Sequence, residues 1–253
     1  MGQTLAVTGK GGTGKTVISA LAIQWLVARG RIPVLAVDAD SNANLHEVLG
    51  LSVCQSVGGI REAALEQARE LAGISKQELL DLRVQQSLVE HTGFDLLVMG
   101  RPEGRGCYCF ANNVLRDVIQ RIAAGYRQLV VDSEAGLEHI SRRTLLRVDH
   151  LCLVSDATVR GVRTAQRISR LVDELETKVA GRGLIVNRAP GDTLPPAVTL
   201  AAQESGLPLW AVIPYDPAIE AMDGGGMTVD DIPDSAPARR AVGLMMTTLM
   251  DSE

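Results

Sequence analysis

The sequence predicts an α/β fold with three layers, in which helices cover both faces of a mostly parallel central sheet. Two observations support this prediction. Short apolar runs bounded by turn residues recur along the 253-residue chain, and most are separated by stretches with the composition of helices. A glycine-rich loop also stands between the first apolar run and the first helical stretch. Because strands that alternate with helices pair through right-handed crossovers, most of the sheet is expected to be parallel.

The expected elements follow one another closely. Each expected strand is a short aliphatic run that stops at a glycine, a proline or a polar residue. The strands are residues 4–8, 33–37, 95–99, 128–132, 150–155, 183–187 and 209–213, and the helices are residues 15–29, 111–124, 137–147, 159–178, 195–205 and 237–250. Segment 56–90 is richer in charge and glutamine, and its apolar residues have helical spacing, so we expect a helical excursion there. No internal repeat is visible, and a single domain over residues 1–253 is expected.

The composition excludes several classes of protein. With 46% hydrophobic and 22% charged residues, the chain has an ordinary globular balance, which argues against disorder. A net charge of −5 argues against a dominant nucleic-acid surface. No run approaches the roughly 18 apolar residues of a membrane span, and the N-terminus lacks the charge pattern of a signal peptide. A cytoplasmic protein that binds neither nucleic acid nor membrane is expected.

The glycine-rich loop has the residues of a P-loop. The apolar residues 5–7 lead into residues 9–16, which read GKGGTGKT, and a helix-like stretch follows. This strand, loop and helix start form the setting in which a P-loop binds nucleoside triphosphate. The loop N–H groups and the helix N-terminus can hold a β-phosphate, Lys15 supplies positive charge, and the Thr16 hydroxyl can bind Mg²⁺. The ordinary motif does not need Lys10, which follows the first glycine directly.

Carboxylates stand at the ends of two expected strands. Asp38 and Asp40 follow the second strand, and Asp132 ends the strand at 128–132. Ligands of parallel sheets gather at the carboxyl ends of the strands, so these acids are expected near the P-loop. Asp132 fits an acid that holds Mg²⁺ through water. Asp40 is interpreted as a base or positioner for the attacking water, and Asp38 as a group behind it or on a Mg²⁺-bound water. The alternative for each acid is helix capping.

The GKGGTGKT form resembles the deviant Walker A motif of the MinD/ParA/nitrogenase-iron-protein class of ATPases, and the resemblance covers essentially the whole chain. It implies a homodimer in which Lys10 reaches the nucleotide of the partner subunit, neutralising charge on the transferred phosphoryl group as an arginine finger does. It also implies that Asn187 contacts adenine and that segment 213–217 closes over the base. The catalytic residues implied are Lys10, Lys15, Asp38 and Asp40. The nucleotide-binding residues implied are Gly9, Lys10, Gly11, Gly12, Thr13, Gly14, Lys15, Thr16, Val17, Asn187, Arg188, Pro214, Tyr215 and Asp216.

A cysteine pair follows the third expected strand. Cys107 and Cys109 lie in a segment with proline and several glycines, a poor place for inert core thiols. Residues i and i+2 of an extended backbone point the same way, so both sulfurs can face one metal ion. Two thiolates leave a four-coordinate site incomplete, whereas a dimer axis would supply four. Two free thiols or a strained disulfide remain alternatives. Cys152 is expected in the core, and Cys54 has no assigned role.

Segments 100–113 and 133–139 closely resemble the CooC-type ATPases, which help insert nickel into carbon monoxide dehydrogenase, with a close branch, AcsF, that serves acetyl-CoA synthase. The resemblance implies a homodimer that holds Ni²⁺ through Cys107 and Cys109 of both chains and acts on one of these apo-enzymes. The same four sulfurs would also take Zn²⁺. Val17 departs from common members of this family, in which a second threonine often follows Thr16.

Two other functions remain open. A positioning ATPase of the MinD/ParA kind is the first, because four arginines recur on one face of a predicted helix, as a nonspecific DNA contact would require. These are Arg160, Arg163, Arg167 and Arg170. A solvated helix face and a dock for an acidic partner enzyme are the alternatives for them. The second function is an iron–sulfur carrier or reductase of the same ATPase class, but such relatives use C-x-x-C or widely spaced cysteines in place of the C-x-C pair found here.

Overall fold

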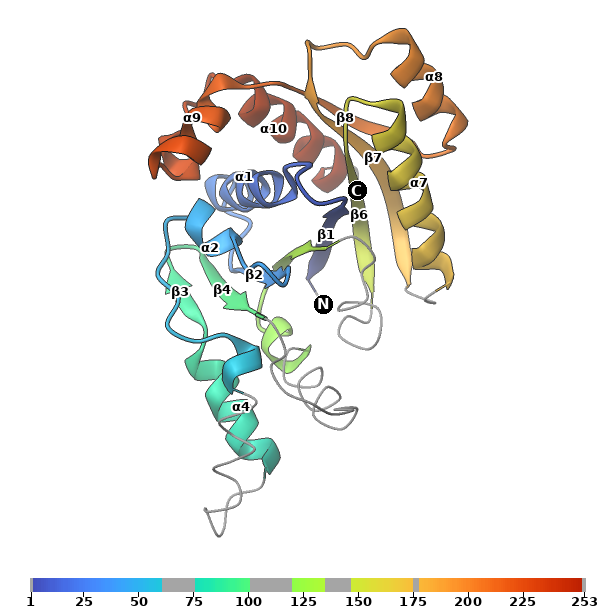
Figure 1. The fold of residues 1–253 in the computed structure, drawn as a ribbon. Helices are drawn as coiled ribbons and strands as arrows, with labels where there is room; N and C mark the ends of the chain where they lie inside the picture. The colour runs from blue at the N-terminus through green and yellow to red at the C-terminus, as the bar shows by residue number, and fades with distance from the viewer. Residues whose placement is uncertain (1, 61–75, 101–119, 135–146, 175–177, 252–253) are drawn as a thin grey trace.

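The computed structural model describes residues 2–60, 76–100, 120–134, 147–174 and 178–251, and it contains a mostly parallel sheet between two layers of helices (Figure 1). The strands are β1 (Gln3–Gly9), β2 (Val34–Ala39), β3 (Val89–His91), β4 (Phe94–Val98), β5 (Gln128–Ser133), β6 (Val148–Asp156), β7 (Val179–Ala189) and β8 (Leu209–Pro214). The helices are α1 (Lys15–Ala28), α2 (Leu45–Val48), α4 (Lys76–Gln86), α7 (Val159–Glu174), α8 (Pro196–Glu204), α9 (Pro217–Gly225) and α10 (Pro237–Met250), with a 3₁₀ turn, η1, at Val229–Asp231.

The order of the strands is β3-β4-β2-β5-β1-β6-β7-β8, and in the described part of the chain only the β3–β4 pair is antiparallel. The central strands β1, β2 and β5 are almost wholly buried because helices cover both of their faces. This explains why they appear in the sequence as continuous aliphatic runs. The predicted fold class is confirmed.

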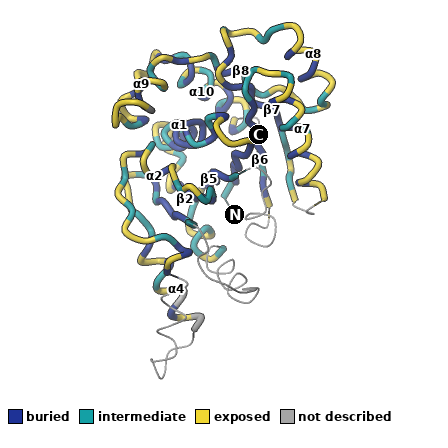
Figure 2. The backbone as a smooth tube through the Cα atoms, in the orientation of Figure 1, coloured by how far each residue is buried: buried dark blue, intermediate teal, exposed yellow. Residues whose placement is uncertain are grey.

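Two hydrophobic cores lie on the two faces of the sheet. One packs α1 and α10 against residues such as Val7 and Val130, and the other packs α7 and α8 against residues such as Ala6 and Val131. Helix α1 is buried on most of its circumference because α10, α2 and η1 pack against it in addition to the sheet. The two helices differ in burial. Figure 2 shows that the central strands and α1 are mostly buried, whereas α7 alternates between buried and exposed residues.

The differences from the expected elements have local causes. Strand β7 begins at Val179, four residues before the expected start, because Val179 already pairs with Val148 although glycines interrupt the apolar pattern. Strand β3, at the end of segment 56–90, and helices α2 and α9 were not expected. Most of the expected helix 111–124 and nearly all of the expected helix 137–147 lie outside the described residues. Within the described residues, no helix has the length and apolar character that crossing a membrane requires.

One buried carboxylate joins two helices at the edge of the sheet. The Oδ1 atom of Asp216 accepts a hydrogen bond from the N–H of Ala218 (3.0 Å), and its Oδ2 atom accepts one from the N–H of Ala238 (3.0 Å). These N–H groups belong to the first turns of α9 and α10, where helix dipoles favour a negative charge. Asp216 therefore holds the start of α10 against the end of β8.

We predict that Asp216→Asn destabilises the protein, because an amide retains only one acceptor oxygen and leaves one helix start without its partner. Urea unfolding should show a loss of about 1–3 kcal/mol in the free energy of unfolding. Asp192→Asn, at an exposed carboxylate, is the matched control and should change it by less than about 0.5 kcal/mol. Equal effects of the two substitutions would contradict the assignment.

Candidate functional site

The P-loop joins the end of β1 to the start of α1, and its backbone needs glycine at defined positions. Gly12 (φ 79°) and Gly14 (φ 88°) adopt left-handed conformations. A Cβ atom at Gly9 would lie 2.3 Å from the carbonyl oxygen of Val154, and one at Gly14 would lie 2.3 Å from the side-chain nitrogen of Asn187. The Thr13 hydroxyl donates to the carbonyl of Lys10 (2.8 Å) and closes the turn. These close approaches and the Thr13 hydrogen bond define the shape of the loop.

The two lysines of the loop occupy different environments. Lys15 is the first residue of α1, and its side chain is buried with 6% exposure. Lys10 is exposed, and no described residue forms an ion pair with it. Lys15 is placed to neutralise a phosphate bound in its own loop, whereas the ammonium of Lys10 is directed to the surface of the subunit.

Three adjacent central strands bring the predicted acids to the P-loop. In the sheet Asp132 pairs with Val7 of β1 on one side and with Asp38 of β2 on the other. Because β1, β2 and β5 are parallel, their carboxyl ends form one edge, and the P-loop starts there. Both Asp38 and Asp132 are fully buried.

Asp38 and Asp132 differ in how their charge is stabilised. The oxygens of Asp38 accept hydrogen bonds from the N–H of Asp40 (3.1 Å) and of Leu45 (2.9 Å), so this carboxylate shapes the turn that leads into α2. Neither oxygen of Asp132 has a hydrogen-bond partner among the described residues. Burial raises the pKa of Asp38 to about 6, although these two N–H groups lower it in part. Burial raises the pKa of Asp132 to about 7, with the Thr16 hydroxyl acting in the opposite direction and the charge of Asp38 adding to the increase.

The surroundings of Asp132 fit a divalent cation. Its two buried oxygens lack partners, and the Thr16 hydroxyl at the second position of α1 lies close enough to influence its pKa. Oxygen ligands of this kind suit Mg²⁺. Asp40 is partly exposed, and its Oδ1 atom accepts from the N–H of Asn42 (2.9 Å), which leaves its other oxygen available. Next to it, the Ser41 hydroxyl donates to the carboxylate of Glu134 (2.7 Å), a contact that the sequence did not indicate.

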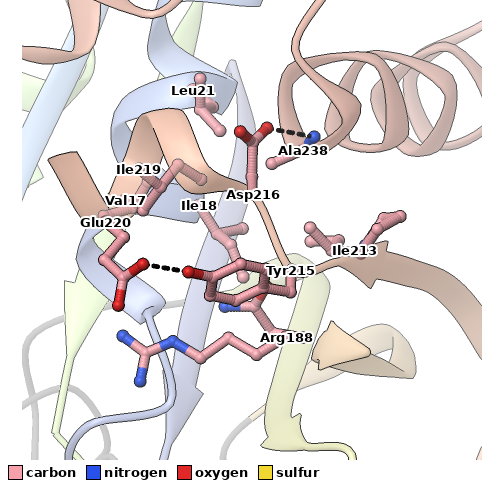
Figure 3. A pocket seen from close by; sticks show the side chains of 12 residues that line it. Val17, Ile18, Leu21, Arg188, Ile213, Tyr215, Asp216, Ile219, Glu220 and Ala238 are labelled. Carbon is pink, nitrogen blue, oxygen red and sulfur yellow. Dashed lines mark hydrogen bonds between the residues drawn. The ribbon is translucent and has the colours of Figure 1, made fainter. Parts of the chain in front are cut away.

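A cavity of about 230 Å³ lies beside the P-loop, between α1 and the ends of β7 and β8. Its floor is apolar, formed by Val17, Ile18 and Leu21 of α1 with Ile213. Figure 3 shows the hydroxyl of Tyr215 directed at the Glu220 carboxylate, to which it donates a hydrogen bond. An apolar floor with polar groups at its rim suits a nucleobase.

Asn187 and Arg188 connect this cavity to the P-loop. The amide nitrogen of Asn187 donates to the carbonyl of Thr13 (2.8 Å), so its oxygen is left as an acceptor. Arg188, which has a left-handed backbone (φ 54°), donates from Nη1 to the carbonyl of Gly12 (3.1 Å). An acceptor at this position suits the exocyclic amino group of adenine.

The structure brings the described residues that the sequence predicted for the nucleotide site to one edge of the sheet. Pro214, Tyr215 and Asp216 line the cavity, but both Asp216 oxygens are engaged by backbone N–H groups, which points to a positioning role. The prediction missed Ile18 and Leu21, although Leu21 lies one helical turn after Val17 and that spacing could have revealed it. It also missed Ile219, Glu220 and Ala238, and the first two belong to the unexpected helix α9.

Cys107 and Cys109 lie outside the described residues, so their predicted metal site stays a prediction. Cys54 is exposed, and Cys152 is buried in the core, where burial raises the pKa of its thiol. The described residues contain no cluster of three or more His, Cys, Asp or Glu side chains that could hold a metal ion.

Comparisons with known proteins agree with this geometry. Residues 4–229 match the family model described as the CobQ/CobB/MinD/ParA nucleotide binding domain. An uncharacterised ATP-binding protein of Methanocaldococcus jannaschii is 41% identical over 234 residues, which cover 91% of this chain and 92% of the relative. The carbon monoxide dehydrogenase accessory protein CooC of Rhodospirillum rubrum is 30% identical over 265 residues, which cover 98% of this chain and 96% of the relative.

Solved structures show the same fold. The cell division ATPase MinD of Pyrococcus furiosus superposes with a TM-score of 0.72 at 23% identity, over 100% of both chains. MinD of Pyrococcus horikoshii, solved with Mg-ADP, superposes with a TM-score of 0.69 at 22% identity, over 99% of this chain and 96% of that one. The chain therefore belongs to the CobQ/CobB/MinD/ParA family of nucleotide-binding proteins and is an ATPase of that family.

Proposed function

We propose that the protein is a dimeric ATPase that carries Ni²⁺ on Cys107 and Cys109 of both subunits and assists its insertion into carbon monoxide dehydrogenase. The observation that carries the ATPase cycle is the contrast between buried Lys15 and exposed Lys10 in one loop. The 30% identity to CooC over 98% of the chain supports the choice of client. Thiolates suit Ni²⁺, although the same four sulfurs also suit Zn²⁺.

The site residues have separate roles in the proposed cycle. The P-loop N–H groups and Lys15 bind the phosphates, and the acceptor oxygen of Asn187 orients adenine. Thr16 and Asp132 would hold Mg²⁺, which neutralises charge on the phosphates when it is bound. Asp40 positions the attacking water, and Asp38 fixes the turn that carries Asp40. Lys10 enters the site of the partner subunit and stabilises the charge of the transferred phosphoryl group.

Dimer closure links the two activities. One C-x-C pair supplies only two sulfurs, so a four-coordinate site needs both subunits. A lysine that acts across the interface likewise needs both subunits. ATP binding would therefore close the dimer and rearrange the sulfur site, and hydrolysis would reopen it for metal delivery.

Two alternatives share this nucleotide chemistry. Acetyl-CoA synthase is a second possible client, because a four-thiolate Ni²⁺ site does not discriminate between the two enzymes. A positioning ATPase is a different class of function, which the fold shared with MinD and the exposed arginines of α7 keep open. A measured stoichiometry of one nickel ion per dimer would favour nickel delivery over a positioning function.

We predict that Lys10→Ala retains nucleotide affinity within about threefold but lowers ATP hydrolysis by about 10²-fold or more, because an arginine-finger group acts mainly in the transition state. Steady-state phosphate release and nucleotide titration measure the two effects. Lys178→Ala, at an exposed lysine distant in sequence, is the control and should leave both unchanged.

Mixing variants tests whether Lys10 acts across the interface. Equal amounts of Lys10→Ala and Asp40→Asn subunits form mixed dimers with one complete site each, so random pairing should restore about a quarter of the wild-type rate. A mixture that stays as inactive as its components would show that Lys10 acts within its own subunit.

The metal site is tested by nickel stoichiometry. Equilibrium dialysis followed by metal analysis should give one nickel ion per dimer, and both Cys107→Ser and Cys109→Ser should abolish binding because each removes two of the four sulfurs. Cys54→Ser, at an exposed free thiol, is the matched control and should bind normally. Unchanged binding in the Cys107 or Cys109 variant would overturn the proposed site.

We predict that Asp132→Asn stabilises the nucleotide-free protein at pH 8, because the folded wild type must then hold an ionised carboxylate in a fully buried site that the Thr16 hydroxyl and the charge of Lys15 stabilise only in part. Since folding raises the pKa of Asp132 from 3.8 to about 7, the wild type loses stability as the pH rises through this window. Urea unfolding should show a gain of about 1–3 kcal/mol for the variant at pH 8 and little gain at pH 5. Mg-ATP should stabilise the variant less than the wild type, and a variant less stable at pH 8 would contradict the account.

A further inference from the structure

We propose that the exposed face of α7 is a docking surface for an acidic segment of a partner protein. The surface consists of Arg160, Arg163, Arg167 and Arg170, which we call the arginine face. The proposal concerns a different surface from the nucleotide and cysteine sites and does not depend on the metal that the protein carries.

The four arginines form one row along the helix. Their spacing of three, four and three residues places them on one side of α7, over a length of about 15 Å at 1.5 Å per residue. All four side chains are exposed, whereas Val162, Ala165, Ile168 and Val172 on the opposite side are buried against the sheet. Figure 2 shows this alternation along α7.

The row does not serve the stability of the helix. Successive arginines are like-charged neighbours at i+3 or i+4, an arrangement that destabilises a helix. Arg160 also lies in the first turn, which contains no acidic residue, and a cation there opposes the helix dipole. The acid on this helix that forms an ion pair, Asp173, is bound to Arg182 of β7 (2.6 Å) instead.

No ion pair within the described residues neutralises the arginine face. Arginine binds carboxylates through two parallel hydrogen bonds, so a row of this kind recognises several acidic side chains at once. Charge complementarity therefore selects an acidic partner.

The borders of the row favour a protein over a nucleic acid. Leu171, beside Arg170, is 43% exposed, and Leu200 on the adjacent helix α8 is 55% exposed. Exposed leucines contribute to protein contacts but not to contacts with a phosphate backbone.

The location links docking to the nucleotide site. Helix α7 follows β6, and Val154 of β6 pairs with Gly9 at the start of the P-loop. The Thr158 hydroxyl accepts from the N–H of Gly161 (3.0 Å) and donates to Asp156 (2.6 Å), which anchors the first turn of α7 to the end of that strand. The Arg160 end of the arginine face therefore lies next to the carboxyl end of β6, at the same edge of the sheet as the P-loop.

The test uses the full chain and a fluorescein-labelled peptide of about 16 residues, with glutamates at helical positions i, i+3, i+7 and i+10 in an alanine and glutamine background. Fluorescence anisotropy at low salt should show binding that the double variant Arg163→Glu/Arg167→Glu weakens about tenfold or more. The control Arg29→Glu/Arg240→Glu makes the same charge change at exposed arginines outside α7 and should leave the affinity within about twofold. The α7 variant should melt no lower than the wild type, because two of the three like-charge pairs in the row become opposite-charge pairs and one remains like-charge.

Three outcomes would overturn the proposal. The first is equal loss of peptide binding in both double variants, which would indicate an unspecific effect of net charge. The second is tighter binding of a random DNA duplex of about 20 base pairs than of the peptide, abolished by the α7 variant, which would assign the face to nucleic acid. The third is a clear drop in the melting temperature of the α7 variant, which would show that the row is structural.

Discussion

The register of three parallel strands is the constraint on which the site depends. Pairing of Asp132 with Val7 and with Asp38 brings the P-loop and both buried acids to one edge of the sheet. A shift of one residue in β2 or β5 would turn its acid to the opposite face, because side chains alternate along a strand. The two hydrophobic cores hold this register from both sides, so the packing of α1 and α7 also determines the geometry of the catalytic groups.

The same edge concentrates polar groups that the fold does not satisfy by itself. Asp132 is buried without hydrogen-bond partners in the described part of the chain, whereas Asp38 binds two N–H groups. Burial of this kind is costly to folding and is retained where a ligand compensates for it. The exposed arginines of α7 form a comparable case at the surface, because their mutual repulsion opposes folding.

Local sequence predicted the central strands and the P-loop because their signals lie within a few residues. Aliphatic runs identify strands that are buried on both faces, and glycines at fixed positions identify the loop. The rest depends on contacts between distant residues. Helix α9 exists because Asp216 caps it while also binding Ala238, and β3 forms because Glu90 and its neighbours pair with β4. Glu220 was therefore not predicted to line the cavity, since its helix was not expected.

The double engagement of Asn187 has an evolutionary consequence. Its amide nitrogen is bound to the P-loop at Thr13, and it lies so close to Gly14 that a Cβ atom there would collide with it. If Asn187 orients adenine as proposed, recognition of the base and the shape of the phosphate loop share one side chain. A substitution there that altered the preferred base would then also disturb the loop that binds the phosphates of every nucleotide.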